Sequence, residues 1–387
     1  MNRFGDILRY ELKKLFVSKV SVLTFLLCAG FLCGLTVAEY LLISPEDIHV
    51  AERERALEGR ELDEELLSRV VDTAKEYGGF SKIPKDNLYH HLAVYINRLM
   101  GSHMSVEGIS GNYSLDSLTA EKAYQTRMDI LHYLYGYFQL TDSEKEYWKQ
   151  REAAIQKPFV WHANYGVWSM KRNFSLLALL AVMMLGICLA GVFASEHVFR
   201  TDDLIRSTRN GKNTVTAAKI LAGEIFSAFA GILLLAAVQI PHVVFNGFHG
   251  LNTVCQMIVP FCSYPYTTGR LLAVCVWIYL EAVLLTGSLV MLLSCTLKNA
   301  IAAAGIVCGA VLLDLFTVVS PQLRMLSQVQ SLMPLQVLIN SSMTDPRLFR
   351  IGGYYLTAYQ TAGILYLLLT DLACMGTFAV YSSRART

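Results

Sequence analysis

Four acidic residues lie within long apolar stretches of the sequence, where a charged side chain is costly. They are Glu224, Glu281, Asp314 and Asp371. Carboxylates in such places can line a water-filled path, hydrogen-bond between helices or across a dimer, or relay protons. The centres of the same stretches contain no Lys or Arg, so the sequence offers no partner and leaves all three roles open. We expect at least one of Glu281 and Asp314 to face a cavity between subunits, and neither to face lipid.

The sequence lacks the common short motifs for nucleotide binding, metal binding and redox catalysis. Gly211-Lys212-Asn213 lacks the upstream Gly and the following Ser or Thr of a phosphate-binding loop. The sequence also has no G-x-G-x-x-G, H-E-x-x-H or C-x-x-C motif. We therefore predict no catalytic residues, no metal site and no cofactor on this chain, no nucleic-acid partner, and a protein that is not an enzyme.

A densely charged loop separates the second and third apolar stretches. Its candidate functional residues, with those at its two ends, are Glu196, Arg200, Asp203, Arg206, Thr208, Arg209, Lys212 and Lys219. The loop fits either a solvated turn with cytoplasmic positive charge or a docking surface for another chain.

The positions of these residues depend on six apolar stretches, each long enough to span a bilayer as a helix. They are 21–43, 174–194, 217–245, 271–297, 300–320 and 356–381. The composition agrees, with 54% hydrophobic and 17% charged residues. The predicted fold class is therefore all-α: a polytopic membrane protein of six transmembrane helices, with a helical extracytoplasmic domain between the first two.

The distribution of Lys and Arg predicts the orientation. Basic residues gather at the N-terminus, in the 195–216 loop, at Lys298 and in the C-terminal tail, which places both termini in the cytoplasm. The opposite loop 246–269 has no charged residue, whereas the loop 321–355 carries three Arg, a mild violation. We expect a multi-pass protein of a bacterial cell membrane.

The predicted organisation along the chain has four parts. Residues 1–19 form a basic amphipathic helix suited to a lipid surface, and residues 20–43 form the first transmembrane helix. Residues 44–172 form the extracytoplasmic domain, and residues 173–387 carry five further transmembrane helices.

The extracytoplasmic segment has a net charge of −4, from 16 Lys and Arg against 20 Asp and Glu. Helix formers predict a helix from Ser44 to Tyr77 that Gly78-Gly79 stops. Further helices are expected over 86–100 and 118–140, and a capping box at Thr141–Glu144 opens another to about residue 156.

The membrane part, about two-thirds of the chain, resembles the permeases of ABC-type exporters of the "ABC-two" family. The matching residues are Glu196, Arg206-Ser207-Thr208-Arg209, Ala217-Ala218-Lys219, the Tyr10–Lys14 segment before the first span and, more loosely, Leu332–Leu335. The resemblance implies a permease that forms the translocation path as a homodimer or heterodimer in membrane lipid. It also implies a separate ATP-binding subunit that holds ATP and Mg and docks on the charged loop.

Two functions from different classes follow. The first is the permease subunit of an ATP-driven exporter of a hydrophobic peptide, antibiotic or lipid-like compound. The alternative is a non-transporting membrane sensor or assembly protein whose outer helical domain binds a ligand or partner. The transported compound, its direction and the pairing of Cys255 with Cys262 stay open.

Overall fold

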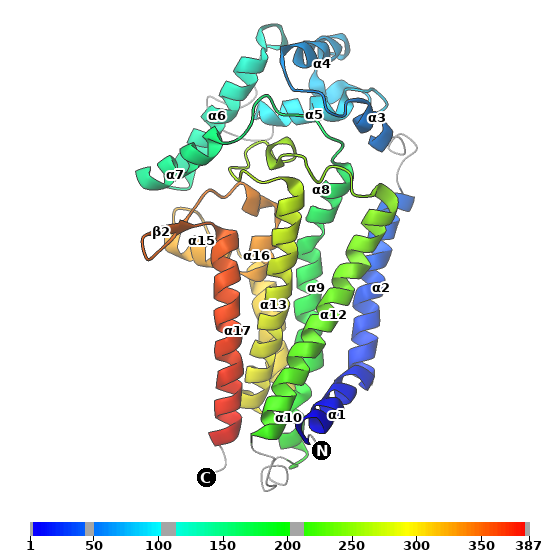
Figure 1. Ribbon diagram of the computed structural model, residues 1–387, viewed down its shortest axis with the longest axis vertical. Helices are drawn as coiled ribbons and strands as arrows, with labels where there is room; N and C mark the ends of the chain where they lie inside the picture. Colours follow the sequence, from blue (N-terminus) through cyan, green and yellow to red (C-terminus); the bar gives the residue numbers. More distant parts are fainter. Residues whose placement is uncertain (1–2, 43–49, 102–113, 202–212, 384–387) are drawn as a thin grey trace.

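The computed structural model describes residues 3–42, 50–101, 114–201 and 213–383. Long helices run side by side along the longest axis of the molecule, and shorter helices cover one end of them (Figure 1). Both ends of the chain lie at the opposite end of this bundle. The protein is therefore a helical bundle with a helical cap, which agrees with the predicted all-α class.

Five described helical stretches are long and apolar enough to cross a membrane. They are α2 (Lys19–Leu41), α8–α10 taken together (Tyr165–Arg172, Phe174–Leu189 and Gly191–Val198), α12 (Thr214–Asn246), α13 (Thr268–Leu297) and α17 (Ala358–Ser383). Apolar side chains throughout these stretches suit helices whose backbone groups are satisfied internally. The protein is a multi-pass membrane protein by these features.

The sixth apolar helix, α14 (Ala300–Phe316), is shorter than predicted. Its 17 residues extend about 25 Å, less than the roughly 30 Å of a hydrocarbon core. The expected end at Ser320 is wrong because the Gln330 side chain holds the chain in an extended form. Its amide donates to the Thr317 carbonyl (2.5 Å), and its carbonyl accepts from the Val319 N–H (3.0 Å). A count of six spans thus stays a prediction.

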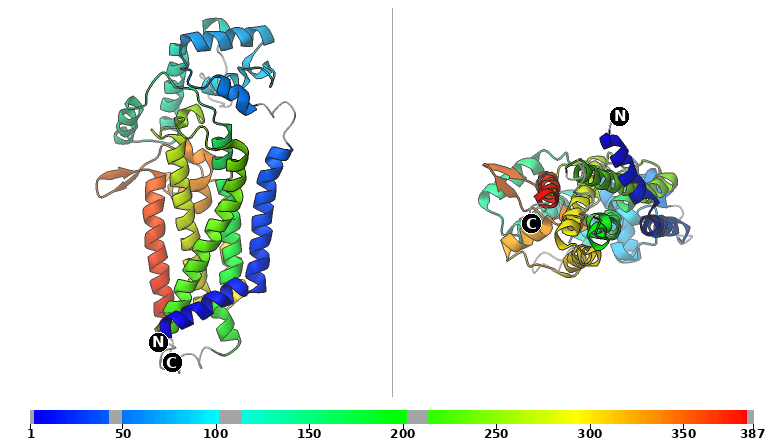
Figure 2. Two further views of the ribbon diagram at one scale, coloured as in Figure 1. Left: turned by 45° about the vertical axis from the view of Figure 1, so that its right-hand side comes forward. Right: turned by 90° about the horizontal axis from the view of Figure 1, so that it is seen from below.

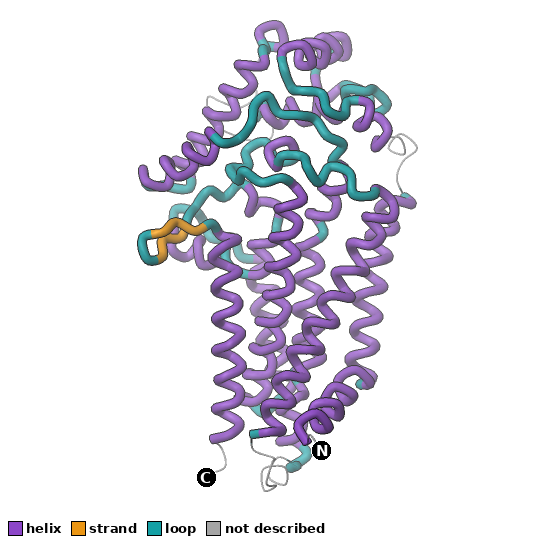
Figure 3. Tube along the Cα trace, viewed as in Figure 1, coloured by secondary structure: helices purple, strands orange, loops and turns teal. Residues whose placement is uncertain are grey.

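Short elements connect α14 to α17 near the cap. They are α15 (Arg324–Ser331), α16 (Pro334–Leu338), η4 (Asn340–Met343) and the strands β1 (Phe349–Ile351) and β2 (Tyr354–Leu356). The strands form an antiparallel hairpin in which Phe349 pairs with Leu356. Figure 3 shows this hairpin beside otherwise helical elements.

The cap consists of the segment between α2 and α8. Its elements are α3 (Val50–Ala56), α4 (Glu64–Tyr77), η1 (Phe80–Lys82), α5 (His90–Leu99), η2 (Leu115–Ser117), α6 (Ala120–Tyr137) and α7 (Asp142–Ala153). The capping box is confirmed, because the Thr141 hydroxyl and the Glu144 carboxylate each accept from the other's backbone N–H. The helix stop is also confirmed, since Gly78 adopts a left-handed conformation at the end of α4.

The predicted continuous helix up to Tyr77 is wrong. Gly59 turns the chain with a φ of +75°, and residues 59–62 then pair with 159–161. The Leu62 N–H donates to the Phe159 carbonyl (2.7 Å), and the Trp161 N–H donates to the Arg60 carbonyl (2.7 Å). These long-range bonds replace the helix between α3 and α4.

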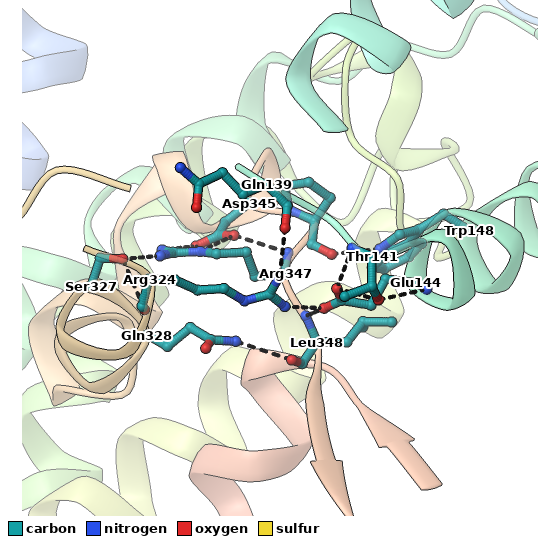
Figure 4. A network of polar contacts seen from close by, with 11 residues as sticks. Gln139, Thr141, Glu144, Trp148, Arg324, Ser327, Gln328, Asp345, Arg347 and Leu348 are labelled. Atoms are coloured by element: carbon teal, nitrogen blue, oxygen red, sulfur yellow. Dashed lines mark hydrogen bonds and ion pairs between the residues drawn. The ribbon is translucent and has the colours of Figure 1, made fainter. Parts of the chain in front are cut away.

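A polar network joins the cap to the connection after α14 (Figure 4). Arg324 donates to the Gln139 carbonyl (2.5 Å) and to Glu144 (2.6 Å), and the Leu348 N–H donates to the same carboxylate oxygen (3.1 Å). Burial alone would raise the pKa of Glu144, but the hydrogen bonds from Arg324 and Thr141 bring it below its ordinary value. The start of α7 is thereby fixed to α15 and β1.

The helix α1 (Arg3–Val17) crosses beneath the bundle at the end away from the cap (Figure 2). Its Phe16 ring meets the edges of Phe226 and Phe229 of α12, each at 5.2 Å between centroids. The Ser18 side chain caps α2, so the predicted helix over 1–19 is confirmed for residues 3–17. Its location on a lipid surface stays a prediction.

Two clusters of buried apolar side chains hold the molecule together. One fills the bundle and the other fills the cap. The helix α6 contributes to both, with Ala123 in the cap cluster and Ile130, Leu131 and Leu134 in the bundle cluster. The boundary at residue 172 therefore does not separate two independent cores.

Candidate functional site

A buried ion pair joins the two helices that flank the charged loop. Lys219 of α12 and Glu196 of α10 are 1% and 6% exposed, and the Lys219 ammonium donates to the Glu196 carboxylate. The same ammonium donates to the Val192 carbonyl (3.3 Å) and lies 4.0 Å from a carboxylate oxygen of Glu11 in α1. A buried charge needs such partners, because desolvation makes an unpaired one costly.

The second carboxylate oxygen of Glu196 extends the cluster to the last helix. It accepts from the Tyr381 hydroxyl of α17 at 2.9 Å. The Phe193 ring completes the packing. Its centroid lies 5.2 Å from the centroid of the Tyr381 ring and 5.5 Å from the Lys219 ammonium nitrogen. Parts of α1, α10, α12 and α17 therefore meet at one point, which we call the basal cluster: Glu11, Phe193, Glu196, Lys219 and Tyr381.

The structure divides the residues predicted to contact an ATPase. Glu196 and Lys219 pair with each other inside the protein, so they can act on a partner only through the backbone that they hold. Arg200 is exposed and adopts a left-handed conformation with φ +55°. Five of the predicted residues lie outside the described part of the chain: Asp203, Arg206, Thr208, Arg209 and Lys212. The docking role of the loop stays a prediction.

The intramembrane acids occupy different environments. Glu224 of α12 accepts from the Cys374 thiol of α17 (3.8 Å), and its other oxygen has no hydrogen-bond partner in the described part of the chain. Asp314, at the end of α14, accepts from the Gln336 amide (3.3 Å) through one oxygen. Asp371 is exposed on α17. No two of the four acids contact each other among the hydrogen bonds of the described residues.

Glu281 of α13 lines a cavity of about 580 Å³ between α13 and α17. We call it the α13–α17 groove, and its lining includes Trp277, Ile278, Glu281, Tyr359, Gly363 and Ile364. Glu281 is 4% exposed, and neither of its carboxylate oxygens receives a hydrogen bond of strict geometry from the residues that the structure describes. The indole N–H of Trp277, one turn away, acts as a weak donor to the carboxylate and lies outside strict hydrogen-bond geometry. Glu281 is thus buried within this chain, and the expectations that it avoids lipid and faces a cavity between subunits stay predictions.

Sequence reasoning missed two buried cations. Lys171 of α8 is 1% exposed and donates to the Leu338 carbonyl (2.9 Å), which fixes the end of α16. Arg127 of α6 is fully buried and forms two hydrogen bonds with Glu152 (2.6 and 3.1 Å). The sequence analysis counted both only in the net charge of the extracytoplasmic segment, and nothing in their local sequence distinguishes them.

Arg127 also joins the cap to the loop between α12 and α13, which contains η3 (Cys255–Met257). Its guanidinium donates to the Pro260 carbonyl (2.7 Å) and the Cys262 carbonyl (3.3 Å). Cys255 and Cys262 are buried free thiols in this loop. A hydrogen bond with Cys262, and then burial, raise the pKa of Cys255.

In the described part of the chain, no group of His, Cys, Asp and Glu side chains is arranged to hold a metal ion. The structure has instead two candidate sites: the basal cluster, where an ion pair joins helices at one end of the bundle, and the α13–α17 groove nearer the cap, which contains Glu281. Comparison with known proteins finds no family model, no curated protein and no solved structure that matches the chain, so its function is inferred from these two sites.

Proposed function

We propose that the chain is the permease subunit of an ATP-driven ABC exporter. In this proposal it has six spans and cytoplasmic termini, pairs with a second permease subunit, and couples to a separate ATP-binding chain. The basal cluster is the observation that carries the proposal. It supports coupling because the charged loop begins and ends at the two helices that the Glu196–Lys219 pair holds together.

Contacts of the basal cluster would transmit a movement of the charged loop to the helices of the bundle. Displacement of the α10 end must move Lys219, and with it the start of α12, because a buried ion pair resists separation. The same carboxylate holds Tyr381, so the last helix is drawn in as well. A partner that pulls on the loop could therefore shift α10, α12 and α17 together, as a permease requires.

Other features favour the same proposal. The helix α1 lies across the base of the bundle, as expected for a helix on the cytoplasmic surface of a membrane (Figure 2). The short helices α15 and α16 follow α14 near the cap, where α16 packs against α9 and α13. In this proposal α14 is the sixth helix that crosses the membrane, and α15 and α16 form a re-entrant segment after it.

Cysteine labelling tests the topology. In a cysteine-free background, Ser68→Cys in α4 is expected to react with a membrane-impermeant maleimide on intact cells. Ser207→Cys in the charged loop should react only after permeabilisation, because the two segments lie on opposite sides. Ser68 is exposed, so burial does not prevent its labelling. The reverse pattern would contradict the proposed orientation.

Reversal of two loop charges tests the coupling. The double variant Arg206→Glu/Arg209→Glu is expected to lose most transport and most of the ATPase that co-purifies with the protein. A single exposed pair contributes only about 0–1 kcal/mol, so two reversals in one interface are needed for a large effect. Pull-down from mild detergent and transport in vesicles measure the two losses.

The matched control is Lys145→Glu/Lys149→Glu on the exposed face of α7, where both lysines make surface ion pairs. It changes the net charge equally but lies in the cap, and it should leave ATPase association intact. If the loop variant retains both ATPase and transport, the docking assignment is wrong.

The sensor alternative has one observation in its favour. Arg127 ties α6 and α7 to the 255–264 loop, so a ligand on the cap could alter the bundle. Purification of the full-length protein without any ATPase, together with ligand binding by the cap, would favour this function over transport.

A further inference from the structure

Glu281 is a buried acid, and no Lys, Arg or His side chain of the described residues forms an ion pair with it. It is 4% exposed, and both of its oxygens are shielded from solvent and receive no hydrogen bond of strict geometry from the described residues. The nearby Tyr366 hydroxyl is engaged, since it donates to the Leu332 carbonyl at 2.6 Å. A carboxylate in apolar surroundings has a high free energy unless it takes up a proton or a positive group accompanies it. The protein thus leaves a place for a cation from outside.

The space beside Glu281 has the size and lining of a small-molecule site. The α13–α17 groove holds about 580 Å³, within the range of pockets that bind drug-sized ligands. Aromatic rings from Trp277 and Tyr359 and aliphatic side chains such as Ile364 line it. Aromatic faces attract cations, and apolar walls accept the body of an amphiphilic ligand.

Gly363 of α17 keeps the space around the carboxylate open. A Cβ atom at this position would lie 3.3 Å from a carboxylate oxygen of Glu281 and 3.7 Å from the Trp277 indole nitrogen. A side chain at this position would therefore press on the Glu281 carboxylate, while its Cβ would make an ordinary van der Waals contact with Trp277. Trp277 is 59% exposed, which leaves its indole room to turn and admit a ligand to the carboxylate.

The charged residues that line the groove determine which ligand charge the groove favours. Among its lining residues only Glu281 and Arg270 are charged. Arg270 stacks on Tyr266 at 4.6 Å, and eleven residues of helix place it about 16 Å from Glu281 along α13. It is too far to pair with the carboxylate. The inner part of the groove therefore favours a single positive charge.

We propose that the α13–α17 groove binds an organic monocation: a protonated amine carried on an aromatic or alkyl body. The ammonium contacts Glu281, and the body lies against Trp277, Tyr359 and Ile364. This site does not depend on the proposed export function, because binding requires neither ATP nor a second subunit.

Three naphthalene probes of similar shape test the proposal. They are the cation of 2-(1-naphthyl)ethylamine, the neutral 2-(1-naphthyl)ethanol and the carboxylate anion of 1-naphthaleneacetic acid. Binding to the full-length protein in lipid nanodiscs is measured by calorimetry. The amine should bind saturably and more tightly than the alcohol, whereas the anion should not bind. A charge-assisted hydrogen bond corresponds to roughly a tenfold to a hundredfold gain in affinity.

Two variants in the groove and one outside it locate the site. Glu281→Gln should weaken amine binding by about tenfold or more and leave alcohol binding unchanged. Gly363→Ala should weaken binding of both neutral and cationic probes, because the added methyl group enters the groove. Glu224→Gln removes a partly buried acid elsewhere in the bundle and should change nothing.

Equal affinity of the amine for the wild type and Glu281→Gln would overturn the proposal, and so would equal binding of alcohol and amine. The latter result would identify an apolar pocket only. Thermal unfolding of each variant confirms that it is folded, so lost binding cannot be mistaken for lost structure. A failed docking experiment at the charged loop would leave this result unaffected.

Discussion

Replacement of Lys219 with methionine is expected to destabilise the protein by about 3–5 kcal/mol. The change leaves the Glu196 carboxylate buried without its main cation, while the Tyr381 hydroxyl remains its only described donor. An unpaired buried charge costs more than the pair contributes, so this loss exceeds that of most single substitutions. Thermal unfolding in detergent, followed by loss of the monodisperse peak on gel filtration, measures it.

The double variant Lys219→Met/Glu196→Gln separates charge from packing. It removes both charges and keeps an oxygen that can accept from Tyr381, so it should recover a large part of the lost stability. Lys145→Met is the surface control, because the side chains of Lys145 and its partner Asp142 are 47% and 99% exposed and pair at 3.0 Å in the cap. It should change stability by no more than about 1 kcal/mol. A Lys219→Met protein as stable as the Lys145→Met protein would contradict the assignment.

Replacement of Arg127 with methionine is expected to cost a similar amount, about 3–5 kcal/mol. The variant leaves Glu152 with Lys157 alone (2.9 Å). It also removes the Arg127 donor from the Pro260 carbonyl and one of the two donors of the Cys262 carbonyl, which keeps Gln256 (3.1 Å). Amide exchange should therefore increase in α7 and in residues 255–264 while the base of the bundle keeps its protection. Hydrogen–deuterium exchange with mass spectrometry resolves these regions.

The effect of Arg127→Met should depend on pH. Burial by itself would raise the pKa of Glu152, but hydrogen bonds and charges of Arg127 and Lys157 bring it below its ordinary value of 4.5. A carboxylate with a lowered pKa stabilises the folded protein above about pH 4.5 and loses this contribution as the pH falls through the lowered value. The difference in free energy of unfolding between the wild type and the variant should therefore shrink only at acidic pH, below about 4.5. Arg69→Met, in an exposed pair, should show no such dependence.

Local patterns in the sequence predicted much of the architecture. Apolar runs of sufficient length identified the long helices, and the Thr141–Glu144 capping box and Gly78 marked helix ends that the structure confirms. These features depend on residues a few positions apart, where spacing alone determines the contact. The end of α14 was missed because Gln330, well beyond the helix, fixes it.

The contacts of the two candidate sites depend on long-range packing. Lys219 and Glu196 are 23 residues apart on helices joined by a loop, and both had seemed to belong to its exposed surface. Glu281 was recognised as an unusual buried acid, but its groove requires Gly363, more than 80 positions away on α17. Sequence periodicity indicates which face of a helix is apolar, whereas it does not indicate which neighbour covers that face.

The shared helix α6 determines how the protein can be dissected. Because Ala123 packs in the cap while Leu134 packs in the bundle, excision of residues 44–172 would expose an apolar face on the fragment and leave a gap in the remainder. Cap and bundle should thus unfold cooperatively, and a recombinant cap would tend to aggregate. Studies of ligands or antibodies against the cap therefore require the intact chain in a membrane mimetic.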